Sequence, residues 1–297
     1  MQHKLFRSFI AWSPLALLSV ATSVAAQPAA LSQRAPATTG DTQVAQEGFK
    51  SAEKPAADSK DANSLKVMAG ALWTAGNSRT LALTGAGDYR LRRSESQFSA
   101  LAAVNFGKSA QDAASPYETT VENYQARLRY DYFFADSVAA FLSVSARRDR
   151  FQGLNLRLNV DPGVAYYFID EQLHLLWGEL GYDVQYDIRR QDVVDAAAAD
   201  ATVPDIAKSE TRHSARAFVG YDNQLSAALK FGTSLEYLQA VQDTTNWRLN
   251  WDGALTSQID SDFSIATTLA VKYEHNPLPG VESTDVVTAL NLVYTVQ

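Results

Sequence analysis

Polar and apolar residues alternate without interruption in the stretch Asn123-Tyr124-Gln125-Ala126-Arg127-Leu128-Arg129-Tyr130-Asp131-Tyr132. Successive side chains of a β-strand point to opposite faces, so a period of two divides this stretch into two surfaces. One surface carries tyrosine, alanine and leucine. The other carries arginine, aspartate, asparagine and glutamine. The stretch therefore predicts a strand with one apolar face and one charged face.

The same period of two extends outward from this stretch, from Leu65 to the end of the sequence. Twelve segments carry it: 65–75, 79–91, 96–107, 120–134, 138–150, 155–169, 173–187, 212–222, 226–239, 246–259, 263–274 and 285–297. Most are longer than the ~5–6 residues usual for strands of globular proteins. Long tilted strands with an apolar and a polar face are typical of outer-membrane barrels. The sequence predicts an all-β fold, a transmembrane antiparallel up-and-down β-barrel of the outer-membrane type with about twelve strands. A soluble periplasmic β-protein is the alternative.

Two kinds of break separate the segments, and they alternate along the chain. One kind is short and polar: 92–95, 135–137, 170–172, 223–225 and 260–262. The other is mostly longer: 76–78, 108–119, 151–154, 188–211, 240–245 and 275–284. Short periplasmic turns and longer outer loops alternate in this way in outer-membrane barrels. The acidic segment 188–211 is expected to be a solvated outer loop, and the gathering of cations near lipopolysaccharide is its alternative role.

Aromatic residues gather near the ends of the segments: Tyr89, Tyr130, Tyr132, Phe133, Phe134, Tyr166, Tyr167, Phe168, Trp247, Trp251, Phe263 and Tyr273. This placement predicts the aromatic girdles of a membrane barrel, although ordinary β-propensity favours the same residues. Pro162 lies inside a segment and cannot donate a backbone hydrogen bond, so a local break in strand pairing is expected there.

The first residues predict a secretory signal peptide over residues 1–26. Lys4 and Arg7 supply a positive start, and an apolar run follows from Phe9 to Val20. Small residues at Val24-Ala25-Ala26 offer a cleavage site. The run is too short, and too interrupted by proline, for a membrane-spanning helix.

Residues 27–64 predict a disordered periplasmic tail, because their Ala, Pro, Ser, Thr and Gln content leaves too little apolar surface to form a core. The barrel is then expected to comprise residues 65–297. The expected location is the cell outer membrane, reached through the signal peptide, with both termini in the periplasm.

The composition excludes several classes of function. The net charge of −7 argues against nucleic-acid binding, and the absence of cysteine excludes disulfides, thiolate metal sites and cysteine nucleophiles. The candidate histidines are His174, His213 and His275. Their spacing indicates no metal site and no cofactor. His213 precedes Ser214 directly, so the two side chains should lie on opposite faces of a strand. No catalytic residue is assigned, and the protein is not expected to be an enzyme.

The strongest functional signal is a set of charges on the face predicted to line the lumen. This network is expected to contain Arg127, Arg129, Asp131, Arg147, Asp149, Arg157, Asp161, Glu179, Asp183, Arg248, Asp252, Lys272 and Glu274. The same face also carries Asp187, Arg216, Asp222, Lys230 and Glu236. Charges so close together in a narrow barrel should form ion pairs. The network is either a plug that fills and rigidifies the lumen or the lining of a narrow path for ions or small polar solutes.

Four stretches of the sequence resemble the family called domain of unknown function 481, described as salt-stress-induced outer-membrane barrels. They are 70–80, with its Gly76-Asn77-Ser78 hairpin, and 123–133, 162–168 and 179–183. The resemblance implies the location and the fold over about residues 65–297, and it carries no catalytic residues.

The expected function is that of a structural barrel related to envelope or osmotic stress. A narrow charge-lined channel is the alternative, and an outer-membrane hydrolase is a second, weaker alternative. The expected partners are outer-membrane lipid, lipopolysaccharide and the barrel-assembly machinery. Nucleic acid is not an expected partner, and the barrel is expected to be a monomer.

Overall fold

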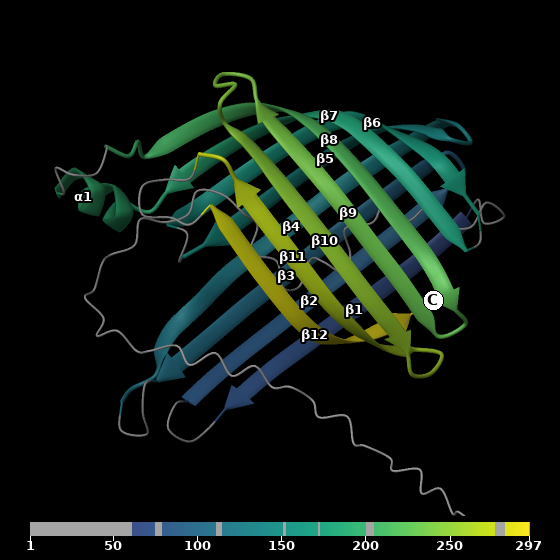
Figure 1. Cartoon of the computed structure of the whole chain (residues 1–297), viewed down its shortest axis with the longest axis horizontal. Coiled ribbons are helices and arrows are strands. Elements are labelled where there is room, and N and C mark those ends of the chain that lie inside the picture. The colour runs from purple at the N-terminus through teal and green to yellow at the C-terminus, as the bar shows by residue number, and fades with distance from the viewer. Residues whose placement is uncertain are drawn as a thin grey trace, which may run out of the picture. The chain divides into compact units, whose positions relative to one another are not determined.

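The computed structural model describes residues 61–74, 79–110, 115–150, 153–171, 173–199, 205–276 and 283–296. Within these ranges the chain forms twelve strands and one helix (Figure 1). In chain order they are β1 Asp61–Thr74, β2 Arg79–Arg93, β3 Ser96–Ala110, β4 Glu118–Ala135, β5 Val138–Asp149, β6 Leu154–Asp170, β7 His174–Arg189, α1 Gln191–Ala199, β8 Ser209–Ser226, β9 Leu229–Ala240, β10 Trp247–Gln258, β11 Phe263–Glu274 and β12 Thr284–Val296. The predicted signal peptide and nearly all of the predicted tail lie outside the described residues.

The strands form one closed antiparallel barrel in which each strand pairs with its neighbours in sequence and β1 also pairs with β12. The prediction of a twelve-stranded antiparallel barrel is confirmed. Closure pairs the two edge strands, β1 and β12, with each other, as a lipid environment favours. Because the strand number is even, β1 begins and β12 ends at the same end of the barrel, and Figure 1 shows the C-terminal end of β12 opposite the end that carries α1.

The barrel is apolar outside and charged inside. Leu180, Leu290 and Phe168 point outward and are 67%, 68% and 60% exposed. The charged residues that alternate with outward residues like these are buried inside, among them Asp131, Asp183 and Glu274. A soluble β-sandwich has the opposite polarity, with its apolar faces inside. This inverted arrangement is the one found in membrane-spanning barrels.

The turn between β8 and β9 lies later than the sequence predicts. The turn was expected at 223–225, which is wrong, because Asn223 and Gln224 still pair with β9 and the turn is formed by Ala227 and Ala228. A register shift after Gln224 accommodates the extra residues. The side chain of Gln224 donates hydrogen bonds to the carbonyl oxygens of Ser226 and Leu229, so a residue typical of turns here stabilises a strand end.

The segment 188–211 is not simply a loop, because α1 occupies Gln191–Ala199 within it. Its alanines have the highest intrinsic helix propensity. The Gln191 side chain donates to Asp195 at 2.8 Å, an i,i+4 contact, and Asp192 lies in the first turn, where it complements the helix dipole. Among the described residues no helix is long and apolar enough to cross a membrane.

The expected break at Pro162 is present in the pairing of β6 with β7. The ladder passes from Val160↔Val184 directly to Gly163↔Gly181. On the other side of β6, Pro162 still stands opposite Leu142 of β5. The interruption therefore affects one ladder only, as expected for a residue that lacks one backbone donor.

The seam that closes the barrel is the shortest ladder. β1 and β12 pair over five residue pairs, from Leu65↔Val296 to Ala69↔Leu292, whereas β1 pairs with β2 from Asp61↔Arg93 to Thr74↔Thr80. The amides of Thr284–Asn291 that point toward β1 are thus expected to exchange hydrogen about tenfold faster or more than those of β8. Hydrogen–deuterium exchange of the refolded barrel measures this difference. Equal protection along β12 and β8 would contradict the prediction.

Candidate functional site

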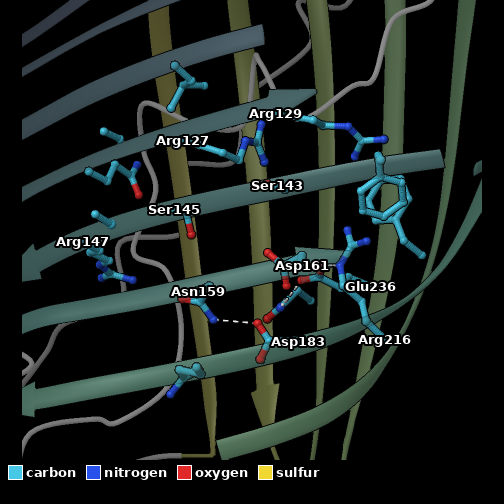
Figure 2. Close-up of a pocket in the computed structure, with 18 of the residues that line it drawn as sticks. Arg127, Arg129, Ser143, Ser145, Arg147, Asn159, Asp161, Asp183, Arg216 and Glu236 are labelled. Atoms are coloured by element: carbon cyan, nitrogen blue, oxygen red, sulfur yellow. Dashed lines mark hydrogen bonds and ion pairs between the residues drawn. The ribbon is translucent and has the colours of Figure 1, made fainter. Parts of the chain in front are cut away.

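The predicted charge network lies inside the barrel. Ten of its thirteen residues are buried: Asp131, Arg147, Asp149, Arg157, Glu179, Asp183, Arg248, Asp252, Lys272 and Glu274. The other three, Arg127, Arg129 and Asp161, are partly exposed to the interior and line its cavity (Figure 2). The alternation of the strands brings all thirteen to one surface, because each lies on the face opposite the outward apolar residues.

The centre of the site is a chain of ion pairs that crosses the lumen. Glu179 of β7 lies 2.9 Å from Arg129 of β4 and 2.8 Å from Arg216 of β8. Arg129 also contacts Asp131 at 2.7 Å, and Arg216 contacts Glu236 of β9 at 2.6 Å. We call these five residues the central chain. Strands β5 and β6 separate β4 from β7 in the sheet, so the contact between Arg129 and Glu179 runs through the interior and not along the wall.

Other predicted residues form local pairs. Arg147 and Asp149 lie two residues apart on β5 and contact each other at 2.6 Å. Arg157 of β6 pairs with Asp187 of β7 at 2.6 Å, through two hydrogen bonds. Such short bidentate contacts fix the orientation of the guanidinium group. The Arg157–Asp187 pair joins two neighbouring strands, and the Arg147–Asp149 pair lies within one.

The remaining predicted residues lie along β4, β6, β7, β10 and β11. Asn159 donates to Asp183 at 2.7 Å, and Figure 2 shows Asp161 beside them. Arg248 donates to the side chain of Gln185 at 3.2 Å. Two further contacts complete this region: Ser234 donates to Asp252 at 3.5 Å, and Arg212 lies 3.7 Å from Glu274. Lys272 is buried on β11.

An aromatic cluster inside the barrel was not predicted. Phe133, Phe141, Tyr167 and Trp177 are buried with Ala139 and Ala165, and Leu175 and Phe218 pack against them. Phe133 and Tyr167 were expected in the girdle that faces lipid, and this assignment is wrong. Phe133 has the same parity along its strand as Asp131, and Trp177 the same parity as Glu179. Each ring lies two residues from an inward charge and so shares its face of the strand. This spacing was the signal that could have placed Phe133 and Trp177 inside.

The central chain and the aromatic cluster are joined by cations that stack on rings. The guanidinium carbon of Arg129 lies 4.0 Å from the centre of the Phe141 ring, and that of Arg92 lies 4.0 Å from the Phe133 ring. Arg216 lies 5.3 Å from the Phe218 ring. Cations within about 6 Å of a ring centre are attracted to the ring face. The two groups thus form one continuous filling of the lumen on the side of β4 to β9.

A cavity of about 140 Å³ remains beside this filling. Among the described residues, seven arginines and five carboxylates line it: Arg90, Arg127, Arg129, Arg147, Arg157, Arg216 and Arg248, and Asp88, Asp161, Glu179, Asp183 and Glu236. The cavity can hold several water molecules. It is smaller than the ~300–1,000 Å³ of pockets that enclose drug-sized ligands. Its charge and size suit water or a small ion.

The three candidate histidines lie apart from this lumen chemistry. The centre of the His213 ring lies 5.8 Å from the centre of the Tyr182 ring, while the adjacent Ser214 is buried inside. The two residues therefore lie on opposite faces, as expected. The His275 ring stacks on Trp247, with 5.2 Å between the ring centres. The Nδ1 atom of His174 lies 3.0 Å from the hydroxyl oxygen of Tyr221. Within the described part of the chain, no group of three or more His, Asp or Glu side chains could hold a metal ion.

Charged groups in the loops and turns serve local structure. The Arg190 guanidinium binds the Asp192 carboxylate at 2.8 Å, and this contact lowers the pKa of Asp192. In the turn between β10 and β11, the carboxylate of Asp260 accepts hydrogen bonds from the backbone N–H groups of Asp262 and Phe263, which lowers the pKa of Asp260. Asp192 is therefore engaged locally, in the first turn of α1.

Gly220 makes room for Trp177 and gives a test of the aromatic cluster. A Cβ atom at Gly220 would lie 2.3 Å from the indole ring of Trp177, which stands opposite it on β7. Gly220→Val is expected to lower the free energy of unfolding by about 1–3 kcal/mol or more through overpacking. Urea unfolding of the refolded barrel measures this loss. Gly87→Val is the matched control, because a Cβ atom at Gly87 meets nothing within 4 Å. Equal stability of the two variants would show that Trp177 is not tightly packed.

Comparison with protein families gives a match to the model described as protein of unknown function, DUF481, over residues 67–296. A comparison with curated proteins gave no match.

Among solved structures, the chain is similar to an outer membrane channel from Pseudomonas putida F1, with 11% identity, a TM-score of 0.45, and coverage of 82% of this chain and 100% of that one. It is also similar to the NanC porin, with 9% identity, a TM-score of 0.44, and coverage of 77% and 97%. The translocator domain of the autotransporter NalP from Neisseria meningitidis shows 10% identity, a TM-score of 0.41, and coverage of 79% and 87%.

Proposed function

This chain belongs to the DUF481 family, and we propose that it is a structural β-barrel of the outer membrane whose lumen is closed by an ion-pair network and which supports the envelope, as under osmotic stress. The observation that carries the proposal is the central chain, Asp131–Arg129–Glu179–Arg216–Glu236, which crosses the lumen. Charges that are paired in this way hold β4 to β7, which is not its neighbour in the sheet, and through β7 to β8 and β9. A barrel filled in this way resists collapse and solute passage.

The proposed location rests on the polarity of the barrel. An apolar exterior with a charged interior suits lipid and is unfavourable in water. Short turns at the end where β1 begins and β12 ends, with longer connections at the other end, support an orientation in which the start of β1 and the end of β12 both face the periplasm. The proposal includes export through the signal peptide at 1–26, insertion by the barrel-assembly machinery and a monomeric state.

A non-enzymatic role is part of the proposal. Hydrolysis by a serine nucleophile needs the hydroxyl and its base within about 2.6–3.2 Å. His213 and Ser214 lie on opposite faces of β8, which argues against this pair.

A narrow channel is the second candidate function, and the cavity of about 140 Å³ favours it. The cavity is lined by charges of both signs, and rings of charged side chains set selectivity in narrow pores. Side chains close the lumen next to it, and side chains can change rotamer on a functional timescale. Small movements of the central chain would connect the cavity to solvent.

Single-channel recording separates the two candidates. The refolded protein in a planar bilayer is expected to give a flat baseline, because the central chain and the aromatic cluster fill the lumen. Insertion must be verified independently, by protease resistance and by the heat-dependent shift in electrophoretic mobility that closed barrels show. Steady unitary openings of the wild-type protein would contradict the closed structural barrel and favour the channel.

A further inference from the structure

Four basic residues gather on the outside of the barrel, at the loop-side ends of three strands. Arg79 begins β2, Lys108 lies near the end of β3, Arg148 lies near the end of β5 and Arg150 follows it. Strand β4 lies between β3 and β5, so the four residues occupy one side of the barrel. We call them the outer basic strip.

The alternation of the strands shows that the strip faces the lipid side. Lys108 has the same parity on β3 as Val104, which is 45% exposed, and the residues between them include buried Asn105. Arg148 has the same parity on β5 as exposed Leu142, and buried Arg147 and Asp149 flank it. The strip is therefore directed away from the lumen network, and the central chain does not use these charges.

Aromatic rings accompany the basic side chains, as expected at a membrane interface. The Arg79 guanidinium lies 4.7 Å from the centre of the Tyr117 ring, and the Lys108 ammonium lies 5.3 Å from the Phe106 ring. Arg148 stands opposite Tyr124 in the ladder between β4 and β5. Amphipathic side chains of this kind lie with their stems on apolar surface and their charges toward headgroups.

Strand β4 brings an acidic residue to the strip. Glu122 of β4 contacts Arg150 at 3.2 Å. Glu122 thus offsets part of the positive charge of the strip, which lies in a chain of net charge −7. On the other side of the barrel, the outward residues at the loop-side ends of β9, β10 and β11 include Tyr237, Trp247 and Tyr273, which are uncharged.

We propose that the outer basic strip, Arg79, Lys108, Arg148 and Arg150, binds the phosphate groups of the lipid A glycolipid in the outer leaflet. The inference rests on the proposed outer-membrane location and orientation, and it is independent of whether the lumen is open. Guanidinium groups bind phosphate oxygens in a bidentate manner, and an ammonium group adds a point charge. The exposed apolar residues below the strip, such as Leu83, Val104 and Leu142, would lie along the acyl chains of the same lipid.

The test compares lipid binding by the full-length refolded protein and by Lys108→Gln/Arg148→Gln. Each basic residue near an anionic membrane surface contributes about 1 kcal/mol, so loss of two should weaken binding of bisphosphorylated lipid A by roughly tenfold or more. Arg93→Gln is the matched control. Arg93 lies at the opposite end of β2, is also outward-facing and well exposed, and its loss should leave binding unchanged.

Dephosphorylated lipid A and phosphatidylglycerol are the comparison ligands, and both should bind at least tenfold more weakly than lipid A. The inference is overturned if dephosphorylated lipid A or phosphatidylglycerol binds as tightly as lipid A, or if the double variant binds lipid A like the wild type. Heat-dependent mobility shows whether each variant is folded, and an Arg148→Gln single variant replaces the double variant if that one does not fold. Binding in detergent does not depend on conductance, so failure here leaves the proposed closed lumen unaffected.

Discussion

Replacing Glu179 by glutamine is expected to lower the free energy of unfolding of the barrel by about 3 kcal/mol or more. Glu179 is 3% exposed and lies between two arginines, at 2.9 Å from Arg129 and 2.8 Å from Arg216. Glutamine has nearly the same size but no charge, so the packing is kept and the attraction is lost. Two largely buried guanidinium groups then face a neutral side chain, and their remaining carboxylates compensate only part of the loss.

Urea unfolding of the refolded protein, followed by tryptophan fluorescence, measures this change. The matched control is Asp192→Asn in the first turn of α1, which breaks an ion pair of similar length, 2.8 Å, between more exposed side chains. Exposed pairs contribute about 0–1 kcal/mol, so this variant should unfold almost like the wild type. If Glu179→Gln also unfolds like the wild type, the central chain does not hold the barrel together.

The sequence was sufficient to predict the strands and their faces, because both depend on a local period of two. Arg127, Leu128 and Arg129 already show which residues share a surface, whatever the rest of the chain does. The local pair Arg147–Asp149 could also be predicted from the sequence, because residues two apart on a strand share a face. The predicted strand boundaries were less accurate where the sequence of a strand end resembles that of a turn. At the end of β8, the polar side chain of Gln224 stabilises the strand.

The pairing across the lumen could not be predicted from local patterns. Which carboxylate meets Arg129 depends on barrel closure and strand stagger, and these are properties of all twelve strands together. Glu179 is 50 positions along the sequence from Arg129, and no local pattern connects them. The aromatic cluster was missed for a different reason. Phe133 lies at a strand end with lipid-facing Phe134 beside it, and aromatic content alone does not distinguish an interface girdle from an interior cluster.

Replacing the whole central chain by alanine is expected to convert a silent barrel into a conducting one. The variant carries Arg129→Ala, Asp131→Ala, Glu179→Ala, Arg216→Ala and Glu236→Ala. All five members are removed together, so none of their charges is left buried without its partner within the chain. Their space adjoins the cavity of about 140 Å³, and the loss of five long side chains would extend this cavity along the lumen. Single-channel recording in a planar bilayer should show unitary steps that the wild type lacks.

A size-matched variant separates the effect of volume from the effect of charge. It carries Arg129→Met, Arg216→Met, Asp131→Asn, Glu179→Gln and Glu236→Gln, which keep most of the side-chain volume and remove every charge of the central chain. If the lumen is closed by filling, this variant stays silent while the alanine variant conducts. If both conduct, the charges close the lumen by holding the walls together. If both stay silent although folded, Phe141 and Trp177 close the barrel without the central chain, and Phe141→Ala would then be the change that opens it.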